Sequence, residues 1–246
     1  MTDYRPPLKD IEFVLNHVAG LPEIGGFEAY PYAEPEFVVG ALGEAGRFAA
    51  EVIAPLNEVG DEEHSRLEDG EVVTPTGFKD AYEAFVASGW PAVAFPEQYG
   101  GGGMPGIVAT AVNELVTTAN MAFSLCPMLT YGAVDMLLEH GSDEHRQQWL
   151  DVLVSGSWAG TMVLTEADAG SDVGALTTKA IPQDDGSYRI TGSKIYITWG
   201  DHDLTDNIVH IVLARTPDAP PGTKGISCFI VPKFIRNDDG SVGEFN

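Results

Sequence analysis

The chain has 246 residues and a formal net charge of −24, from 37 acidic against 13 basic side chains. A surface this acidic repels phosphate groups, which argues against binding to nucleic acids and to anionic membranes. Hydrophobic residues make up 44% of the chain, an ordinary share for a globular protein with a buried core.

The first 157 residues predict a helical domain. Ser142 stands at the N-cap position of the last predicted helix. Polar, glycine-rich or proline-rich stretches at 60–77 and 90–106 predict loops, the first with a short extended piece. Six segments carry apolar residues at helical spacing: residues 10–18, 36–53, 76–88, 107–120, 131–140 and 143–154.

The pattern changes near residue 157, and the rest of the chain predicts short antiparallel strands. The turn at 183–186 joins two of these strands as a hairpin. Helices followed by strands predict the α+β class, with a helical domain at 1–157 and a β domain at 158–246. The predicted strands are residues 158–164, 177–182, 187–190, 194–198, 207–215 and 226–232.

Residues 238–246 predict a turn that enters a further strand. A β domain that stops there leaves an edge unpaired, so we expect an incomplete domain that more chain or a partner completes. Cys126 and Cys228 lie far apart without CxxC spacing, which indicates a reducing compartment. The N-terminal segment lacks a signal-peptide pattern, and no apolar run reaches membrane-spanning length. These features predict a cytoplasmic protein.

Residues 162–172 (MVLTEADAGSD) predict a strand that runs into a loop of small residues. Small side chains let a ligand approach the backbone, and successive amide N–H groups can hold a pyrophosphate. A second segment, residues 194–200 (KIYITWG), places Tyr196 and Thr198 on one face of a predicted strand. An aromatic plane beside a hydroxyl suits a flat ring cofactor. The alternatives are an acidic loop and an ordinary strand facing the core.

The segment LTEADAGSD resembles the signature of acyl-CoA dehydrogenases, and ITGSKIYIT is similar to the second flavin-binding strand of that family. The long N-terminal segment resembles the larger bacterial branch, which includes broad-chain mycobacterial-type and 3-methylmercaptopropionyl-CoA dehydrogenases. Further matches follow in the family's order: PEQYGGGG at 96–103, EHGSDEHRQQWL at 139–150 and KGISCFIVPK at 224–233.

The resemblance implies three domains, and the C-terminal helical bundle is missing from this chain. It implies FAD as cofactor, Thr165 at the pyrimidine end of the flavin, Thr198 at flavin N5, and Tyr196 in place of the family's usual Trp. Ser171 and Thr216 are the implied substrate contacts. The implied FAD contacts are Met162, Leu164, Thr165, Gly170, Ser171, Tyr196, Ile197 and Thr198.

The family's catalytic base is a Glu in the C-terminal bundle, which the resemblance places beyond Asn246. Glu166 lies in the signature and is interpreted as structural, because it orients the loop. Trp199 stands where many members have Asn. The residues expected nearest the acyl chain are 125–131 and 92–95, which are apolar and would serve equally as core.

The implied activity is oxidation of a saturated acyl-CoA to trans-2-enoyl-CoA, with electrons passing from FAD to an electron-transfer flavoprotein. The intact protein is expected to be a homo-oligomer and the isolated chain to be inactive. The alternatives are a 3-methylmercaptopropionyl-CoA dehydrogenase and a non-catalytic subunit of a heteromeric flavoprotein.

Residues 101–106 satisfy GxGxxG, which leaves an NAD-dependent dehydrogenase as a weaker hypothesis. Pro105 and the consecutive glycines are atypical of a turn that opens into a helix. The histidines have no metal-ligand spacing, and Glu166, Asp168 and Asp172 lack the spacing of a calcium loop, so no metal site is predicted.

Overall fold

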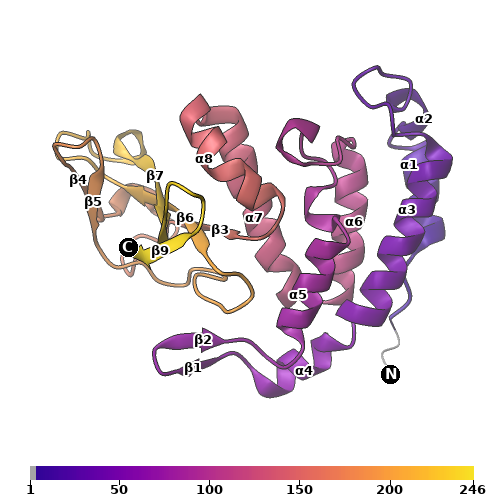
Figure 1. Cartoon of the computed structure of the whole chain (residues 1–246), viewed down its shortest axis with the longest axis horizontal. Coiled ribbons are helices and arrows are strands. Elements are labelled where there is room, and N and C mark those ends of the chain that lie inside the picture. Colours follow the sequence, from indigo (N-terminus) through magenta and orange to yellow (C-terminus); the bar gives the residue numbers. More distant parts are fainter. Residues whose placement is uncertain (1–3) are drawn as a thin grey trace.

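The computed structural model describes residues 4–246, so the first three residues of the segment searched for a signal peptide lie outside it. Figure 1 shows the helices side by side in one half of the molecule and the strands in the other. The helices are α1 (Leu8–His17), α2 (Leu21–Ile24), α3 (Pro35–Phe48), α4 (Leu56–Glu63), α5 (Phe78–Ala87), α6 (Gly106–Ala119), α7 (Met121–His140) and α8 (Asp143–Val154).

The strands form one three-stranded sheet and three hairpins. The sheet has the order β3 (Ala159–Val163), β6 (Ile208–Ala214) and β7 (Ser227–Pro232). The hairpins are β1 (Arg66–Glu68) with β2 (Glu71–Val73), β4 (Lys179–Pro182) with β5 (Tyr188–Thr191), and β8 (Phe234–Arg236) with β9 (Val242–Phe245).

The α+β class is confirmed, and one strand pairing differs from the expectation. Strand β3 pairs with β6 in parallel, whereas β6 pairs with β7 antiparallel. The long connection between β3 and β6 carries the β4–β5 hairpin and returns the chain to the starting end of the sheet, which a parallel pair requires. The division into domains at residue 157 stays a prediction.

Helix α7 begins ten residues earlier than the predicted start at residue 131. Pro127 lies inside it, and a proline removes one backbone hydrogen bond, which disfavours a helix at this position. The Asn120 side chain caps the helix by accepting a hydrogen bond from the Phe123 N–H at 3.0 Å. Burial of Phe123, Cys126 and Thr130 along one face offsets the lost bond.

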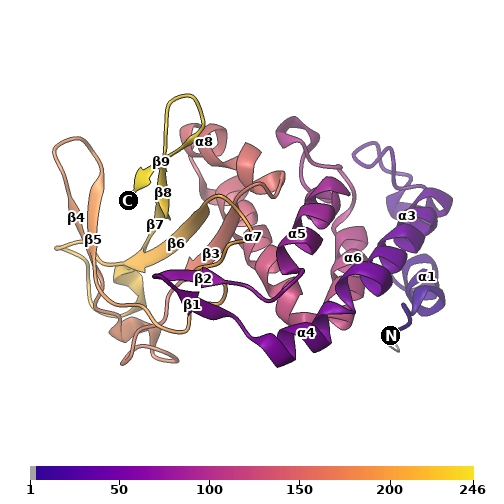
Figure 2. The ribbon, with the colours of Figure 1, turned by 60° about the horizontal axis from the view of Figure 1, so that its bottom comes forward.

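By length and composition alone, α7 is apolar enough to cross a membrane, so the prediction that no segment reaches this length was wrong. Its contacts are those of a core helix, because it packs on α6, α8 and β3. Residues 60–63, predicted as loop, belong to α4, and the extended piece predicted nearby is the β1–β2 hairpin (Figure 2).

Two hydrophobic clusters meet at α7. Its first half packs with α3, α5 and α6, where the rings of Phe85 and Phe123 lie edge to face with centroids 6.0 Å apart. Its second half contributes Val134 and Leu137 to a cluster with α8 and Val209 of β6. Both halves of the molecule therefore depend on the position of α7.

Strand β3 lies directly on α7, and Gly160 makes this approach possible. A Cβ at residue 160 would lie 2.7 Å from the Ala133 Cβ and 3.3 Å from the Thr130 Cα. The Gly160 N–H donates to the Thr130 hydroxyl at 2.9 Å, inside the core. No side chain larger than hydrogen fits between the strand and the helix without moving one of them.

We expect Gly160→Ala to destabilise the protein by about 1–3 kcal/mol, because overpacking of a filled core forces the backbone to shift. Gly132→Ala is the matched control: it lies on α7 with open space around its Cβ position. It should raise stability by up to about 1 kcal/mol through helix propensity. Urea unfolding of both variants measures this, and equal stabilities would contradict the close approach.

Candidate functional site

The predicted cofactor loop begins where β3 ends. Met162 is the one exposed residue of β3, and Leu164 and Thr165 continue beyond the strand. Glu166 and Ala169 then exchange backbone hydrogen bonds of 3.2 and 3.1 Å, which closes a tight turn. The turn presents Ala167, Gly170 and Ser171 at the surface, whereas Ala169 is buried.

The Glu166 carboxylate holds this turn from inside. It is 6% exposed and accepts hydrogen bonds from the backbone and hydroxyl of Thr177, at 2.7 and 2.8 Å. Its other oxygen accepts from the backbone and hydroxyl of Thr178, at 2.9 and 2.5 Å, and from Lys194 Nζ at 3.0 Å. Five donors converge on one carboxylate, so its lone pairs are fully used.

Burial alone would raise the pKa of the Glu166 carboxyl, but hydrogen bonds from Thr178, Thr177 and Lys194 together hold this pKa far below its ordinary value. Such a carboxylate stays ionised and has no free lone pair for a substrate proton. The interpretation of Glu166 as structural is therefore confirmed. Sequence reasoning missed Lys194, although a single Lys and Glu in the two signature segments were a signal for a pair.

The two predicted flavin segments are neighbours. Lys194 Nζ donates to the Leu164 carbonyl at 2.8 Å, and the Ile195 N–H donates to the Thr165 carbonyl at 2.9 Å. These bonds connect residues 30 apart in sequence and hold the second segment alongside the first loop. The two segments therefore lie side by side at the level of the backbone.

Residues 194–198 do not form the predicted strand. Tyr196 and Trp199 adopt left-handed backbone conformations, with φ of 57° and 50°, which interrupt the alternation of faces. The argument that Tyr196 and Thr198 share a strand face was therefore wrong. The Gly200 N–H bonds to the Ile197 carbonyl at 3.0 Å, so the segment ends in a turn instead of a ladder.

The predicted cofactor residues form an open surface. Tyr196 is 89% exposed and Met162 42%. Gly170, Ser171 and Thr198 are also exposed, whereas Leu164, Thr165 and Ile197 are half-buried. These residues come from one loop and one turn, and neither of the two cavities described below includes them.

The polar groups on this surface fit FAD. Within residues 4–246, the backbone N–H groups of Gly170, Ser171 and Asp172 donate to no protein acceptor. A Cβ at Gly170 would meet open space. The hydroxyls of Thr165, Ser171 and Thr198 also have no partner among these residues. Successive free N–H groups suit a pyrophosphate, and free hydroxyls suit the polar edge of a flat ring.

Thr216 lies apart from this surface, in a cavity of about 1150 Å³ beside the β4–β5 hairpin. The rings of Tyr188 and Phe229 pack 5.0 Å apart in its wall, and Arg189 supplies a cation. Ser171 is not among its lining residues. The two predicted substrate contacts are therefore not brought into one cavity within the described residues.

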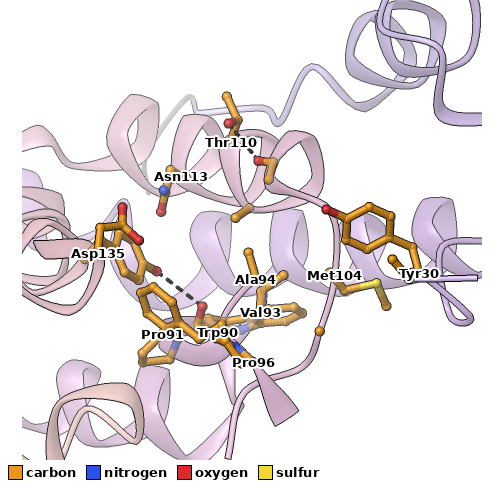
Figure 3. A pocket seen from close by; sticks show the side chains of 16 residues that line it. Tyr30, Trp90, Pro91, Val93, Ala94, Pro96, Met104, Thr110, Asn113 and Asp135 are labelled. Atoms are coloured by element: carbon orange, nitrogen blue, oxygen red, sulfur yellow. Dashed lines mark hydrogen bonds between the residues drawn. The ribbon is translucent and has the colours of Figure 1, made fainter. Parts of the chain in front are cut away.

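A second cavity, of about 530 Å³, lies among the helices. Figure 3 shows Asn113 and Asp135 at one end of it and Tyr30 and Met104 at the other. Burial raises the pKa of the Asp135 carboxyl. Its lining includes residues 93–95 and Tyr131, from the stretches predicted nearest the acyl chain, but none of the predicted flavin contacts.

The glycine stretch at 101–106 does not have the setting of a dinucleotide-binding turn. A 3₁₀ turn (Glu97–Tyr99) precedes it and α6 follows. A Cβ at Gly101 would lie 2.0 Å from the Phe95 carbonyl oxygen, and one at Gly102 would lie 2.8 Å from the Val93 carbonyl oxygen. These glycines serve close backbone packing, and the required strand is absent between residues 90 and 106.

A further buried group lies beside the second segment. His202 is 4% exposed, and burial lowers its pKa to about 4. Its Nδ1 accepts a hydrogen bond from the Leu204 N–H at 3.2 Å, so Nε2 carries the proton in the neutral ring. Nε2 faces the Cys126 Sγ of α7 at 4.0 Å. Sequence reasoning found no role for this histidine.

Comparison with known proteins gives a consistent result. The sequence profile described as "Acyl-CoA dehydrogenase, N-terminal domain" matches residues 41–157, and "Acyl-CoA dehydrogenase, middle domain" matches residues 161–243. The chain is 48% identical to 3-methylmercaptopropionyl-CoA dehydrogenase of Ruegeria pomeroyi, over 99% of this chain and 41% of the relative.

The chain is also 38% identical to the broad-specificity linear acyl-CoA dehydrogenase FadE5 of Mycobacterium tuberculosis, over all of this chain and 41% of the relative. Among solved structures it resembles butyryl-CoA dehydrogenase from Megasphaera elsdenii, with a TM-score of 0.64 and 25% identity. That alignment covers 79% of this chain and 48% of the other. The chain thus spans less than half the length of these relatives.

We expect Glu166→Gln to destabilise the protein by about 3 kcal/mol or more, because it leaves the Lys194 charge buried without its partner. Asp168→Asn is the matched control, since Asp168 lies in the same loop and is exposed. Its stability should stay within about 0.5 kcal/mol of wild type.

The double variant Glu166→Gln with Lys194→Met separates charge from packing. It should recover part of the lost stability, since no uncompensated charge remains. Urea unfolding at neutral pH measures all three variants. A Glu166→Gln protein as stable as the Asp168→Asn protein would show that the converging donors contribute nothing.

The depressed pKa of His202 predicts acid sensitivity. Between its ordinary pKa of 6.5 and its folded pKa of about 4, the unfolded chain binds the proton that the folded protein excludes. Stability from this group is complete above pH 6.5 and falls by up to about 3 kcal/mol as the pH drops toward 4. Burial also lowers the pKa of His210, which adds to the slope.

We therefore expect His202→Gln to lose stability less steeply than wild type between pH 6.5 and 5. His145→Gln, which replaces an exposed histidine, should keep the wild-type slope. The measurement is the free energy of unfolding in urea at several pH values. Identical slopes for all three proteins would contradict the buried, neutral state of His202.

Proposed function

Because the chain belongs to the acyl-CoA dehydrogenase family, we propose that residues 162–171 and 194–198 form one side of the FAD site of an acyl-CoA dehydrogenase. The observation that carries this proposal is the hydrogen bond from the Ile195 N–H to the Thr165 carbonyl, which joins the two segments. Free N–H groups and free hydroxyls on the joined surface support it.

FAD, when bound, supplies the acceptor for the hydride that leaves the β-carbon of the thioester. The free N–H groups of Gly170 and Ser171 would hold the pyrophosphate, and the Thr165 hydroxyl would bind the pyrimidine edge. The Thr198 hydroxyl would address flavin N5, and Tyr196 would lie against the ring. Fixed donors at these places stabilise the negative charge that develops during the reaction.

The α-proton needs a carboxylate base, and Glu166 is unsuited because five donors occupy it. We propose that the base is a Glu in the part of the family that lies beyond this chain, which spans 41% of its curated relatives. The reaction is oxidation of a saturated acyl-CoA to trans-2-enoyl-CoA. The chain alone is proposed to be inactive for want of this base.

The 48% identity to the Ruegeria pomeroyi enzyme favours 3-methylmercaptopropionyl-CoA as a second candidate substrate. The proposal has four further parts. The electron acceptor is an electron-transfer flavoprotein, the protein is a homo-oligomer in the cytoplasm, and the domain boundary lies at residue 157. A non-catalytic subunit remains the alternative outside catalysis. It is favoured if the protein purifies with a second, different chain that carries the base.

The test uses the protein expressed from its complete coding sequence. We expect it to purify with FAD, and its visible flavin absorption to bleach when a saturated acyl-CoA is added without oxygen. The corresponding free acid should leave the absorption unchanged, because the thioester is what acidifies the α-proton. Comparing bleaching rates for butyryl-CoA and 3-methylmercaptopropionyl-CoA decides between the two substrates.

A matched pair of variants tests the assigned surface. Thr165→Val should weaken FAD binding about tenfold, by losing one hydrogen bond to the ring. Thr110→Val should leave FAD binding unchanged, since the Thr110 hydroxyl bonds to the Gly106 carbonyl within α6. Absence of flavin from the protein, or flavin that no saturated acyl-CoA reduces, would refute the proposed function.

A further inference from the structure

In the segment Tyr196–Thr198, Tyr196 and Thr198 are exposed and Ile197 is half-buried, so the conformation of the segment depends on what holds its two ends. The leading end is fixed by Lys194 and Ile195, which bond to the Leu164 and Thr165 carbonyls. Between the ends, Tyr196 is 89% exposed and adopts a left-handed conformation. A non-glycine residue keeps such a conformation where its surroundings fix the backbone.

Trp199 fixes the trailing end. Its Nε1–H donates to the Ala122 carbonyl in the first turn of α7 at 3.0 Å, across 77 residues of sequence. Its ring stacks on Phe78 of α5, with centroids 6.5 Å apart and planes 28° apart. The ring also meets the edge of His202, with centroids 5.5 Å apart. Three partners on separate elements thus hold one side chain.

The loop that follows Trp199 is attached to the same helix and to the β1–β2 hairpin. His202 Nε2 faces the Cys126 Sγ at 4.0 Å, one turn along α7 from Ala122. The Asp203 carboxylate accepts from the backbone and hydroxyl of Thr74, at 3.1 and 2.7 Å. Trp199 therefore joins a firmly held loop to an exposed segment.

We infer that Trp199 is a positioning residue, which sets the place of Tyr196 and Thr198 through its bond to α7. This inference rests on the proposed function. Thr198 is the neighbour of Trp199 in the chain, and its hydroxyl has no protein partner of its own among residues 4–246. A binding group placed by another side chain loses its effect when displaced by about 1 Å.

The experiment compares Trp199→Phe with Trp149→Phe. The first substitution removes the Nε1–H donor and keeps an aromatic ring against Phe78. The second removes the same atoms from a tryptophan that packs on Trp158 in the cluster of α7 and α8, away from the segment. Both variants are made in the protein expressed from the complete coding sequence. The measurements are FAD affinity, the visible flavin spectrum and, in the apoprotein, amide hydrogen exchange of residues 195–200.

We expect Trp199→Phe to weaken FAD binding about five- to tenfold, as for loss of one hydrogen bond, and to shift the flavin bands. Amide exchange of residues 195–200 should accelerate by a similar factor while exchange in the helical core is unchanged. Trp149→Phe is expected to lower global stability but to leave FAD affinity and exchange of the segment within twofold of wild type.

The outcomes separate this inference from the proposed function. If wild type binds FAD and Trp199→Phe keeps its affinity and segment exchange within twofold of wild type, the positioning role is wrong. If both tryptophan variants weaken FAD binding equally, Trp199 acts only through global stability, which also overturns the inference. If wild type binds no FAD, the proposed function fails, and the exchange measurement alone decides whether Trp199 holds the segment.

Discussion

The contact between β3 and α7 is the constraint on which the rest of the structure depends. Gly160 lets the strand lie against Ala133 and Thr130, where any Cβ would collide. Helix α7 contributes to both hydrophobic clusters, so its position couples the helices to the sheet. The end of β3 carries the first flavin segment, and the start of α7 holds Trp199 of the second. One packed interface therefore places both halves of the candidate site.

The ion pair of Glu166 and Lys194 then shapes the site without taking part in the proposed chemistry. Glu166 is buried among five donors, and its low pKa keeps it ionised as a structural anion. Lys194 forms an ion pair with this carboxylate. It also donates a hydrogen bond to the Leu164 carbonyl, which holds the second segment beside the first. The protein's own polar groups satisfy this network. The groups that remain free lie on the outer surface: the N–H groups of residues 170–172 and the hydroxyls of Thr165, Ser171 and Thr198.

The described residues are proposed to supply one side of a site, which agrees with the share of the relatives' length that the chain covers. The chain covers 41% of its curated relatives and 48% of the butyryl-CoA dehydrogenase chain, and the Glu166 carboxylate of its signature is unsuited to act as base because five donors occupy it. Its predicted flavin contacts form an open surface instead of a cavity. The proposed role of this part is to hold and orient a cofactor, while proton abstraction is proposed for another part of the protein.

Much of the fold was predictable from the sequence, because helices and strands each require a characteristic spacing of apolar residues along the chain. Apolar spacing predicted α1, α3, α5, α6 and α8, alternation predicted β6 and β7, and small residues after β3 predicted the signature turn. Periodicity is local, so it carried no information on pairings between distant residues. Only the tertiary structure decided that α7 runs through Pro127, that β3 and β6 are parallel, and that Glu166 meets Lys194. It also decided that residues 194–198 are no strand: Trp199 contacts residues 77 and more positions away, and Tyr196 and Trp199 adopt backbone angles that local preference disfavours.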